Sequence, residues 1–162
     1  MNWQGFEQAA PDLAAIGRTR IEKGRLVLVG TLRADGSPRI SPVEAFFVEG
    51  ELLLGMMWQS RKALDLLRDP RLVVHTPTCD PAGTEGDFKA YGRAADVTDA
   101  GLRTRYADVL EARIDWRPSE PFHLFSVDVE SAGFIVFGKE PVAMRWNPAD
   151  GFSRIIHPDS PA

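Results

Sequence analysis

The chain has 162 residues, 44% of them hydrophobic and 26% charged, which is the composition of one globular domain large enough to bury a core. Its net charge of −4, with no run of Lys or Arg, argues against nonspecific nucleic-acid binding, and the single cysteine, Cys79, excludes an intrachain disulfide and a cysteine zinc cluster. No segment has the length of a membrane span, and the first residues lack a secretory signal pattern. We therefore expect a single domain over residues 1–162 that works in the cytoplasm and binds neither nucleic acid nor a membrane.

The first third of the chain predicts a helix followed by a β-meander. Helical spacing relates a set of small and apolar residues, namely Phe6, Ala9, Ala10, Leu13, Ile16 and Gly17. Pro11 marks the expected start of the helix, with a looser turn before it. The apolar run 25–32 predicts a strand buried on both faces. Residues 39–48 predict the returning strand and residues 52–57 a third strand, with glycine-containing turns between them.

The remaining pattern alternates strands with a few helices. In chain order we expect a short helix between Ser60 and Pro70, a strand over 72–75, a loop over 76–86, a strand over 87–97, a helix from Asp99 to about Arg113, strands over 122–128 and 133–137 separated by a break at 130–132, and a hairpin of strands over 142–146 and 152–156. The polar tail, 157–162, is expected to be frayed. Seven or eight strands with only three helices predict a mainly β fold, a closed antiparallel barrel with peripheral helices.

The short helix after Ser60 has an unusual charge pattern at its start. Ser60 suits the N-cap position, where its hydroxyl can accept a hydrogen bond from a free backbone N–H. Arg61 and Lys62 then occupy the first turn, where each uncompensated cation costs roughly 0.3–1 kcal/mol against the helix dipole. A bound phosphate would compensate both cations and accept from the free N–H groups. The alternative is that both side chains turn into water.

Several familiar catalytic patterns are missing from the sequence. It contains no GxGxxG after a strand, no GxxxxGK[ST] and no GxSxG, which excludes Rossmann, P-loop and hydrolase-elbow interpretations. Its three histidines, His75, His123 and His157, lack the spacing of metal ligands, and His75 suits a satisfied position in the barrel better than a ligand position. Trp58 and Trp146, taken alone, favour packing over cofactor contact. No residue stands out as a general acid or base.

Seven short segments, in this order along the chain, together carry a family resemblance. They are Gly30–Arg39, Pro42–Val43, Gly50–Leu52, Ser60–Ala63, Asp69–Arg71 before an apolar strand, Phe122–Phe125 and Arg145–Pro148. In this combination the chain resembles the pyridoxamine-phosphate-oxidase-like, flavin-binding split β-barrel proteins, closely from about Arg25 to Val97 and more loosely to Arg154. The resemblance implies a split antiparallel barrel that forms a homodimer and holds two FMN molecules in grooves at the subunit interface.

The resemblance also implies a set of cofactor-binding residues. The strand from Arg39 to Glu44 would lie along the flavin, with Arg39 reaching toward the phosphate and the backbone of Pro42 and Val43 meeting the ring system. The other implied contacts are Ser60, Arg61 and Lys62 at the phosphate, Met57 and Trp58 beside the ribityl chain or ring, Lys89 and Tyr91 toward the flavin of the other subunit, and Trp146 and Arg154 in the closing segment. The phosphate site is the one that the helix charges predict independently.

Two departures from the family pattern concern the substrate. Glu44 stands where pyridoxamine-phosphate oxidases have a lysine that helps to hold the substrate phosphate, and the substrate-binding run of Tyr, Arg and Ser has no counterpart between Thr104 and Glu120. We therefore expect an FMN-dependent oxidoreductase acting on a small molecule other than pyridoxamine phosphate. The alternatives are a reductase that uses the deazaflavin coenzyme and a noncatalytic flavin- or haem-binding protein.

The residues near the phosphate site also suggest the kind of substrate. Met56, Met57 and Trp58 precede the helix, and Phe46 and Phe47 end the neighbouring strand. Because side chains alternate along a strand, only about half of these would face a groove, where they would favour an apolar, planar ligand. The alternative is that all five belong to the barrel core.

Overall fold

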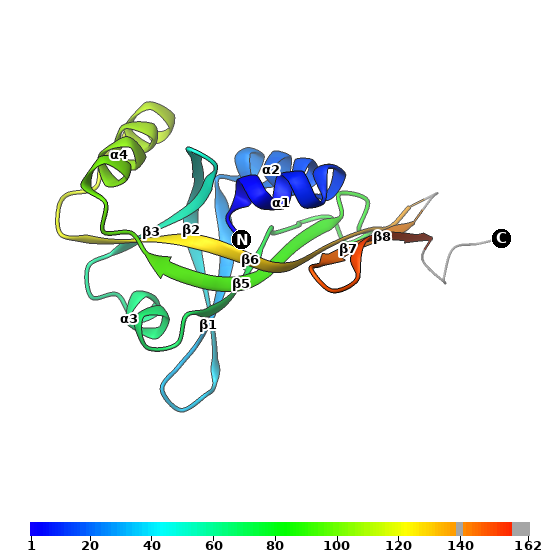
Figure 1. Ribbon diagram of the computed structural model, residues 1–162, viewed down its shortest axis with the longest axis horizontal. Helices are drawn as coiled ribbons and strands as arrows, with labels where there is room; N and C mark the ends of the chain where they lie inside the picture. The colour runs from blue at the N-terminus through cyan, green and yellow to red at the C-terminus, as the bar shows by residue number, and fades with distance from the viewer. Residues whose placement is uncertain (139–140, 157–162) are drawn as a thin grey trace.

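Within residues 1–138 and 141–156, which the computed structural model describes, the chain forms eight strands and four helices (Figure 1). The strands are β1 (Leu26–Leu32), β2 (Pro38–Val48), β3 (Glu51–Met57), β4 (Arg71–His75), β5 (Asp87–Asp96), β6 (Phe122–Val136), β7 (Val142–Asn147) and β8 (Gly151–Ile156). The helices are α1 (Trp3–Ala9), α2 (Pro11–Gly24), α3 (Arg61–Arg68) and α4 (Ala100–Ile114). The expected tail, 157–162, lies outside the described residues.

The strands form one antiparallel sheet in the order β3-β2-β1-β4-β5-β6-β7-β8, and a further pairing of β3 with β6 closes the first six strands into a barrel. β7 and β8 extend from the barrel at one end, and α1 and α2 lie side by side against it (Figure 1). This arrangement confirms the predicted antiparallel barrel with peripheral helices. None of the helices in the described part of the chain is long and apolar enough to cross a membrane.

The first strand corrects one expectation, because it is buried on one face only. In β1 the side chains of Val27, Val29 and Thr31 point into the barrel and are buried, while Leu26 and Leu28 lie on the outer face and are exposed or half-buried. Arg25 is the C-cap of α2 in a left-handed conformation, so the strand begins one residue later than expected. The apolar residues on the outer face are therefore a surface feature of the chain.

The beginning of the chain is a helix and not a loose turn. Asn2 caps α1 by accepting a hydrogen bond from the backbone N–H of Gly5, and Trp3 and Phe6 are fully buried against the barrel. Pro11 starts α2, as predicted. Because two aromatic side chains of α1 enter the core, burial stabilises a helix that is too short to persist alone.

The expected break at 130–132 is a β-bulge inside one continuous strand, β6. The register of β5 and β6 shifts between Tyr91, which pairs with Ser131, and Gly92, which pairs with Val129. Residue Glu130 is thereby left without a partner in the ladder. A Cβ at Gly92 would lie 1.9 Å from the carbonyl oxygen of Asp128, so the close approach of the two backbones at the bulge requires glycine.

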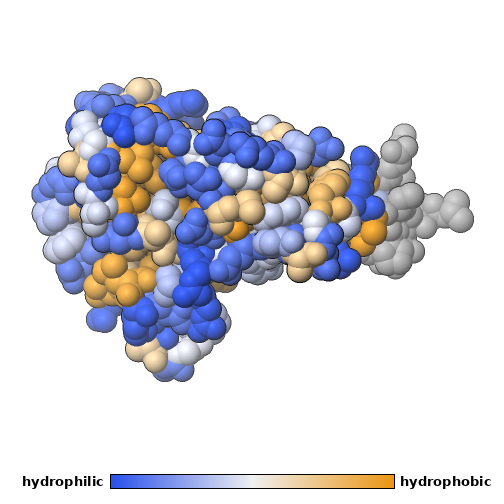
Figure 2. Space-filling view, viewed as in Figure 1, coloured by the Kyte–Doolittle hydropathy of each residue, from blue (hydrophilic) through white to orange (hydrophobic). Residues whose placement is uncertain are grey.

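Apolar side chains form two separate cores. The larger one fills the barrel and extends under α1 and α2. The smaller one lies outside the barrel, where Tyr106 and Leu110 of α4 pack against Phe46, Leu53 and Leu124 of the sheet. Figure 2 shows further hydrophobic side chains at the surface of this end of the molecule, where α3 and α4 lie. The second core thus fixes α4 against the sheet at the end of the barrel where α3 also lies.

Candidate functional site

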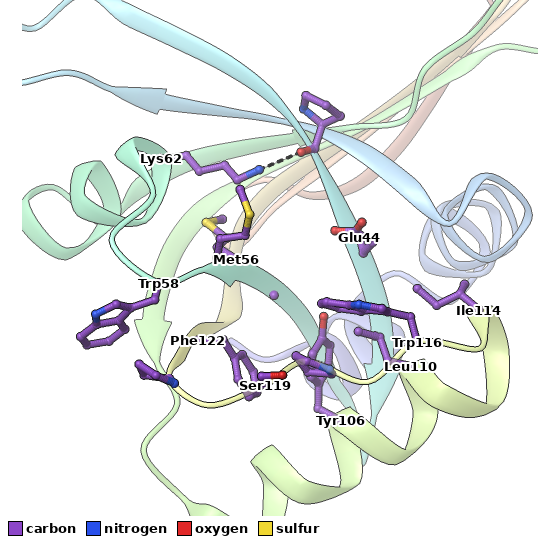
Figure 3. A pocket seen from close by; sticks show the side chains of 15 residues that line it. Glu44, Met56, Trp58, Lys62, Tyr106, Leu110, Ile114, Trp116, Ser119 and Phe122 are labelled. Carbon is purple, nitrogen blue, oxygen red and sulfur yellow. Dashed lines mark hydrogen bonds between the residues drawn. The ribbon is translucent and has the colours of Figure 1, made fainter.

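A cavity of about 600 Å³ opens between α4, the start of α3 and the outer face of β2 and β3 (Figure 3). Its lining residues are Pro42 and Glu44 of β2, Gly55, Met56 and Met57 of β3, Trp58, Lys62 of α3, Tyr106, Leu110 and Ile114 of α4, and Trp116, Pro118, Ser119, Pro121 and Phe122 after it. Figure 3 shows Glu44 and Lys62 on one side of the cavity and Tyr106 and Phe122 on the other. The site therefore combines an apolar, aromatic wall with two charged side chains.

The floor of the cavity depends on the contact between α4 and β3. Tyr106 is almost fully buried, and its hydroxyl points from α4 toward Gly55, which has no side chain to obstruct it. Burial and, next, the negative charge of Glu44 raise the pKa of Tyr106 well above its ordinary value, while a hydrogen bond with the backbone of Gly55 acts in the opposite direction. The hydroxyl consequently stays protonated at neutral pH.

The aromatic wall is exposed to an unusual degree for such large rings. Trp58 is 52% exposed and Trp116 is 53% exposed, although both line the cavity. Arg103 of α4 fixes the end of the loop that carries Trp116. It forms an ion pair with Glu120 at 3.0 Å and donates a hydrogen bond to the carbonyl oxygen of Phe122. Its guanidinium group also stacks 4.2 Å from the centre of the Phe122 ring. Flat apolar surface at the rim of a pocket favours a planar ligand.

The start of α3 has some of the features expected of it and lacks one. Ser60 is the N-cap residue as expected, but its hydroxyl makes no capping hydrogen bond. Its Oγ is shielded from water and has no hydrogen-bond partner among the described residues. Arg61 is exposed, and Lys62 Nζ donates to the carbonyl oxygen of Pro42 at 3.0 Å. Free N–H groups and an unpartnered hydroxyl therefore lie at this helix end, with Lys62 on the side of the larger cavity and Arg61 on the side of a second one.

On the other side of α3, a second cavity of about 400 Å³ contains most of the nearby arginines. It is lined by Arg33, Ala34, Asp35, Arg39, Arg61, Leu64, Asp65 and Arg68. Asp65 is 4% exposed and accepts hydrogen bonds from Arg39 Nε at 2.7 Å and Thr31 Oγ1 at 3.0 Å. Burial alone raises the pKa of Asp65, but the hydrogen bonds from Arg39 and Thr31 outweigh it and leave the pKa below its usual value. Arg39 thus anchors α3 to the β1–β2 hairpin.

The cofactor residues predicted from the sequence do not all lie together. Pro42, Glu44, Met57, Trp58 and Lys62 line the larger cavity, and Arg39 and Arg61 line the second cavity. Ser60 is the N-cap residue of α3 and is not among the residues that line either cavity. Lys89, which pairs with Asp87 at 2.8 Å, and Tyr91 lie on the outer face of β5, away from both cavities. The side chains of Val43 and Trp146 are buried in the barrel core, where Trp146 packs 5.2 Å from Phe6. Cofactor contact by these residues stays a prediction.

Two groups of residues at the site were missed by the sequence analysis. One is the wall contributed by α4 and the following loop, for which the only signal was the rigid, proline-rich segment around Trp116. The other is His123, which is 5% exposed, stacks on Trp58 at 4.5 Å and has an Nε2 atom without a hydrogen-bond partner in the described chain. No feature of the sequence pointed to this ring stack, because the two residues are 65 positions apart.

The histidines do not form a metal site in the described part of the chain, where no cluster of three or more His, Cys, Asp or Glu side chains could hold an ion. His75 lies on the outer face of β4, 3.8 Å from Asp87, and burial lowers its pKa. The Nδ1 atom of His75 is shielded from water and has no hydrogen-bond partner among the described residues. The prediction that the hydrogen-bonding groups of His75 are satisfied is therefore wrong. His157 lies outside the described residues.

Comparison with known proteins identifies a family that the sequence matches and solved structures with a similar fold. Residues 17–135 match the family model described as pyridoxamine 5'-phosphate oxidase. No curated protein matches the sequence. Among solved structures, the chain is similar to a Clostridium acetobutylicum protein related to general stress protein 26, of the pyridoxinephosphate oxidase family, with 14% identity over 85% of this chain and 95% of the other and a TM-score of 0.66.

Two further structures resemble the chain at similar levels. A heme binding protein from Mycobacterium smegmatis shares 17% identity over 89% of this chain, with a TM-score of 0.64, and the chain spans 57% of the length of that protein. PhzG from Burkholderia lata, in complex with tetrahydrophenazine-1-carboxylic acid, shares 11% identity over 94% of this chain and 91% of the other, with a TM-score of 0.60. At these identities the likeness concerns the fold.

Proposed function

Because the chain belongs to the pyridoxamine 5'-phosphate oxidase family, we propose that it is an FMN-dependent oxidoreductase whose cofactor phosphate binds at the start of α3. The observation that carries the proposal is the unpartnered, shielded Oγ of Ser60 beside Arg61 and Lys62. A buried hydroxyl without a partner is costly, and a phosphate oxygen would accept its hydrogen bond. FMN would supply the hydride chemistry, and the chain would position it and shape the substrate pocket.

The residues around the larger cavity fit such a cofactor. Lys62 points to the cavity side of α3, and among the described residues its one hydrogen bond is to the backbone carbonyl oxygen of Pro42 in β2. The exposed outer face of Pro42 and the rings of Trp58 and Trp116 offer flat surface for a conjugated ring system. Arg39 is already paired with Asp65, so we assign it to positioning α3 and assign the direct phosphate contacts to Ser60, Arg61 and Lys62.

We further propose that the protein is a C2 homodimer, with the partner covering the outer face of the barrel. Across four neighbouring strands, Ile40 pairs with Gly30, Gly30 with Val73, and Val73 with Tyr91, so these residues form one continuous row. Ile40 is 72% exposed, and Tyr91 is also exposed. A contiguous apolar row on a sheet face is typical of a protein interface. In this arrangement Lys89 and Tyr91 would reach the cofactor of the other subunit.

The substrate we propose is not pyridoxamine phosphate. Glu44 lines the cavity, and a carboxylate at that position repels a phosphate dianion. Much of the cavity wall is instead made of thioether and aromatic side chains, among them Met57 and Phe122, which suit a planar molecule with a mainly apolar surface. Of the five residues expected to line the groove, Met57 and Trp58 do so as exposed side chains, and Met56 lines it although most of its side chain is buried in the first core. Phe46 belongs to the second core and Phe47 packs against the first.

The absorption spectrum of the untreated purified protein tests this proposal. A flavin spectrum, with FMN rebinding after removal, supports it. A colourless protein that binds only the deazaflavin coenzyme would assign the chain to deazaflavin reductases, and a Soret band would assign it to haem-binding proteins. Either result contradicts FMN dependence, and so does the absence of flavin binding in a folded protein.

A further inference from the structure

Glu44 is an exposed carboxylate that lines the larger cavity and has no ion-pair partner among the described residues. Among the residues that line it, Glu44 and Lys62 are the only ones that carry a charge, in the part of the chain that the structure describes. Lys62 is engaged with the carbonyl oxygen of Pro42, whereas Glu44 has no hydrogen bond or ion pair with any described residue. Resting on the function proposed above, we infer that the second ligand of this cavity, the substrate, is a planar aromatic molecule that carries a positive charge.

The division of charge within the cavity supports this assignment. In the proposed holoprotein the cofactor phosphate takes the positions near Lys62 and the start of α3, which neutralises the cations. The remaining charge on the cavity wall is then the Glu44 carboxylate. Glu44 is exposed, so water screens part of its charge, but a carboxylate a few ångströms from a bound ligand still attracts a cation. The site would therefore favour a cationic ligand over a neutral ligand of the same shape.

The aromatic residues of the cavity also favour a cationic ligand, independently of Glu44. Trp116 and Tyr106 line the cavity on the side of α4, and Phe122 and Trp58 line it beyond them (Figure 3). The face of an aromatic ring attracts cations, and Trp does so best. The ring of Trp116 is about half exposed and free to pack against a planar ligand. Flat rings together with a single carboxylate form a recognition site for a delocalised organic cation.

The hydroxyl of Tyr106 does not replace the missing partner of Glu44. Tyr106 is held by the backbone of Gly55 and by burial in the second core, so its position is set by the fold. It can donate one hydrogen bond, but it brings no positive charge into the cavity. A bound cationic ligand would therefore neutralise the negative charge of Glu44, which Tyr106 cannot do.

A matched pair of probes tests the inference directly. N-methylacridinium is a permanent planar cation, and acridine is nearly the same shape and is uncharged in mildly alkaline buffer. Each is titrated into the full-length protein, with and without FMN, and binding is followed by probe fluorescence. We expect the cation to bind at least about tenfold more tightly than acridine, and Glu44→Gln to reduce this preference to within about threefold.

Controls separate the inference from the proposed function and from general charge effects. Glu130→Gln removes an exposed carboxylate at the β6 bulge and should leave the preference unchanged, while Trp116→Ala should weaken both probes. Equal affinity for the two probes, undetectable binding of the cation, or a preference that survives in Glu44→Gln overturns the inference. FMN affinity is measured separately by flavin fluorescence. Normal FMN binding without a charge preference contradicts the cation site alone, whereas a charge preference without FMN binding contradicts the cofactor proposal alone.

Discussion

The hydroxyl oxygen of Tyr106 occupies the space that a side chain at Gly55 would need, since a Cβ at residue 55 would lie 2.2 Å from it. This contact joins α4 to the sheet at the floor of the larger cavity. We predict that Gly55→Ala displaces Tyr106 and destabilises the protein by about 1–3 kcal/mol, because overpacking a filled core forces neighbouring groups to move. The measurement is chemical denaturation. Gly24→Ala is the matched control, because a Cβ there meets no atom within 4 Å.

The phosphate site gives the second prediction. Lys62→Ala and Arg61→Ala should each weaken FMN binding roughly ten- to a hundredfold, since hydrogen bonds to charged groups contribute about 1.5–3 kcal/mol. Flavin fluorescence titration measures the affinity, and Lys23→Ala in the last turn of α2 serves as a control for loss of an exposed cation. Unchanged affinity in both α3 variants, with the fold intact, would refute the site.

The third prediction concerns Asp65, which holds α3 against the β1–β2 hairpin through Arg39 and Thr31. Asp65→Asn should lower the free energy of unfolding by about 1.5–3 kcal/mol, because the charge-assisted bond to Arg39 is lost. Asp69→Asn is the control: Asp69 pairs with Arg71 on the surface, and solvent screening leaves such pairs little effect. Equal destabilisation by the two variants would contradict the assigned role.

The lowered pKa of Asp65 also predicts how stability depends on pH. In the folded protein this carboxyl binds its proton less readily than in the unfolded chain, whose reference pKa is 3.8. Its stabilising contribution is therefore fully present above that value and is lost as the pH falls through the lower, folded pKa. Denaturation across this acid range should show a smaller loss of stability in Asp65→Asn than in the unmodified protein. Parallel pH profiles would count against the shift.

The exposed row on the barrel gives the fourth prediction. Ile40→Lys places a charge at the most exposed apolar position of the proposed interface and should convert a dimer into a monomer, because an unpaired charge in an apolar interface is costly. Light scattering at micromolar concentration measures the mass. Leu67→Lys, at an exposed apolar position on α3, should leave the dimer intact. A monomeric unmodified protein with flavin bound rules out the proposed assembly.

The fifth prediction is that the protein does not convert pyridoxamine phosphate to pyridoxal phosphate at a useful rate. Like charges separated by a few ångströms cost on the order of several kcal/mol at an effective dielectric constant of about 20, and Glu44 brings such a charge into the cavity. Product absorbance during turnover of the FMN-loaded protein is the measurement. Efficient product formation shows the prediction to be wrong, and Glu44→Lys should increase the affinity for pyridoxamine phosphate.

Features that depend on near neighbours in the chain could be predicted from the amino-acid sequence. Alternation of apolar residues and glycine-containing turns, such as the one at Gly36 with its positive φ of 83°, were enough to predict the strands of the barrel. The N-cap position of Ser60 and the two cations after it followed from the same local rules. These features can be predicted because each involves residues within a few positions of one another.

Contacts between distant segments were decided by the tertiary structure. The fit of Tyr106 over Gly55, the pairing of Arg39 with Asp65 and the stacking of Trp58 on His123 each join residues that are 26 or more positions apart. No local sequence pattern predicts such a pair, because each residue taken alone is compatible with many partners. Only closure of the barrel and docking of α3 and α4 against it brought these residues together, and with them the cavity that leaves Glu44 unpaired among aromatic rings.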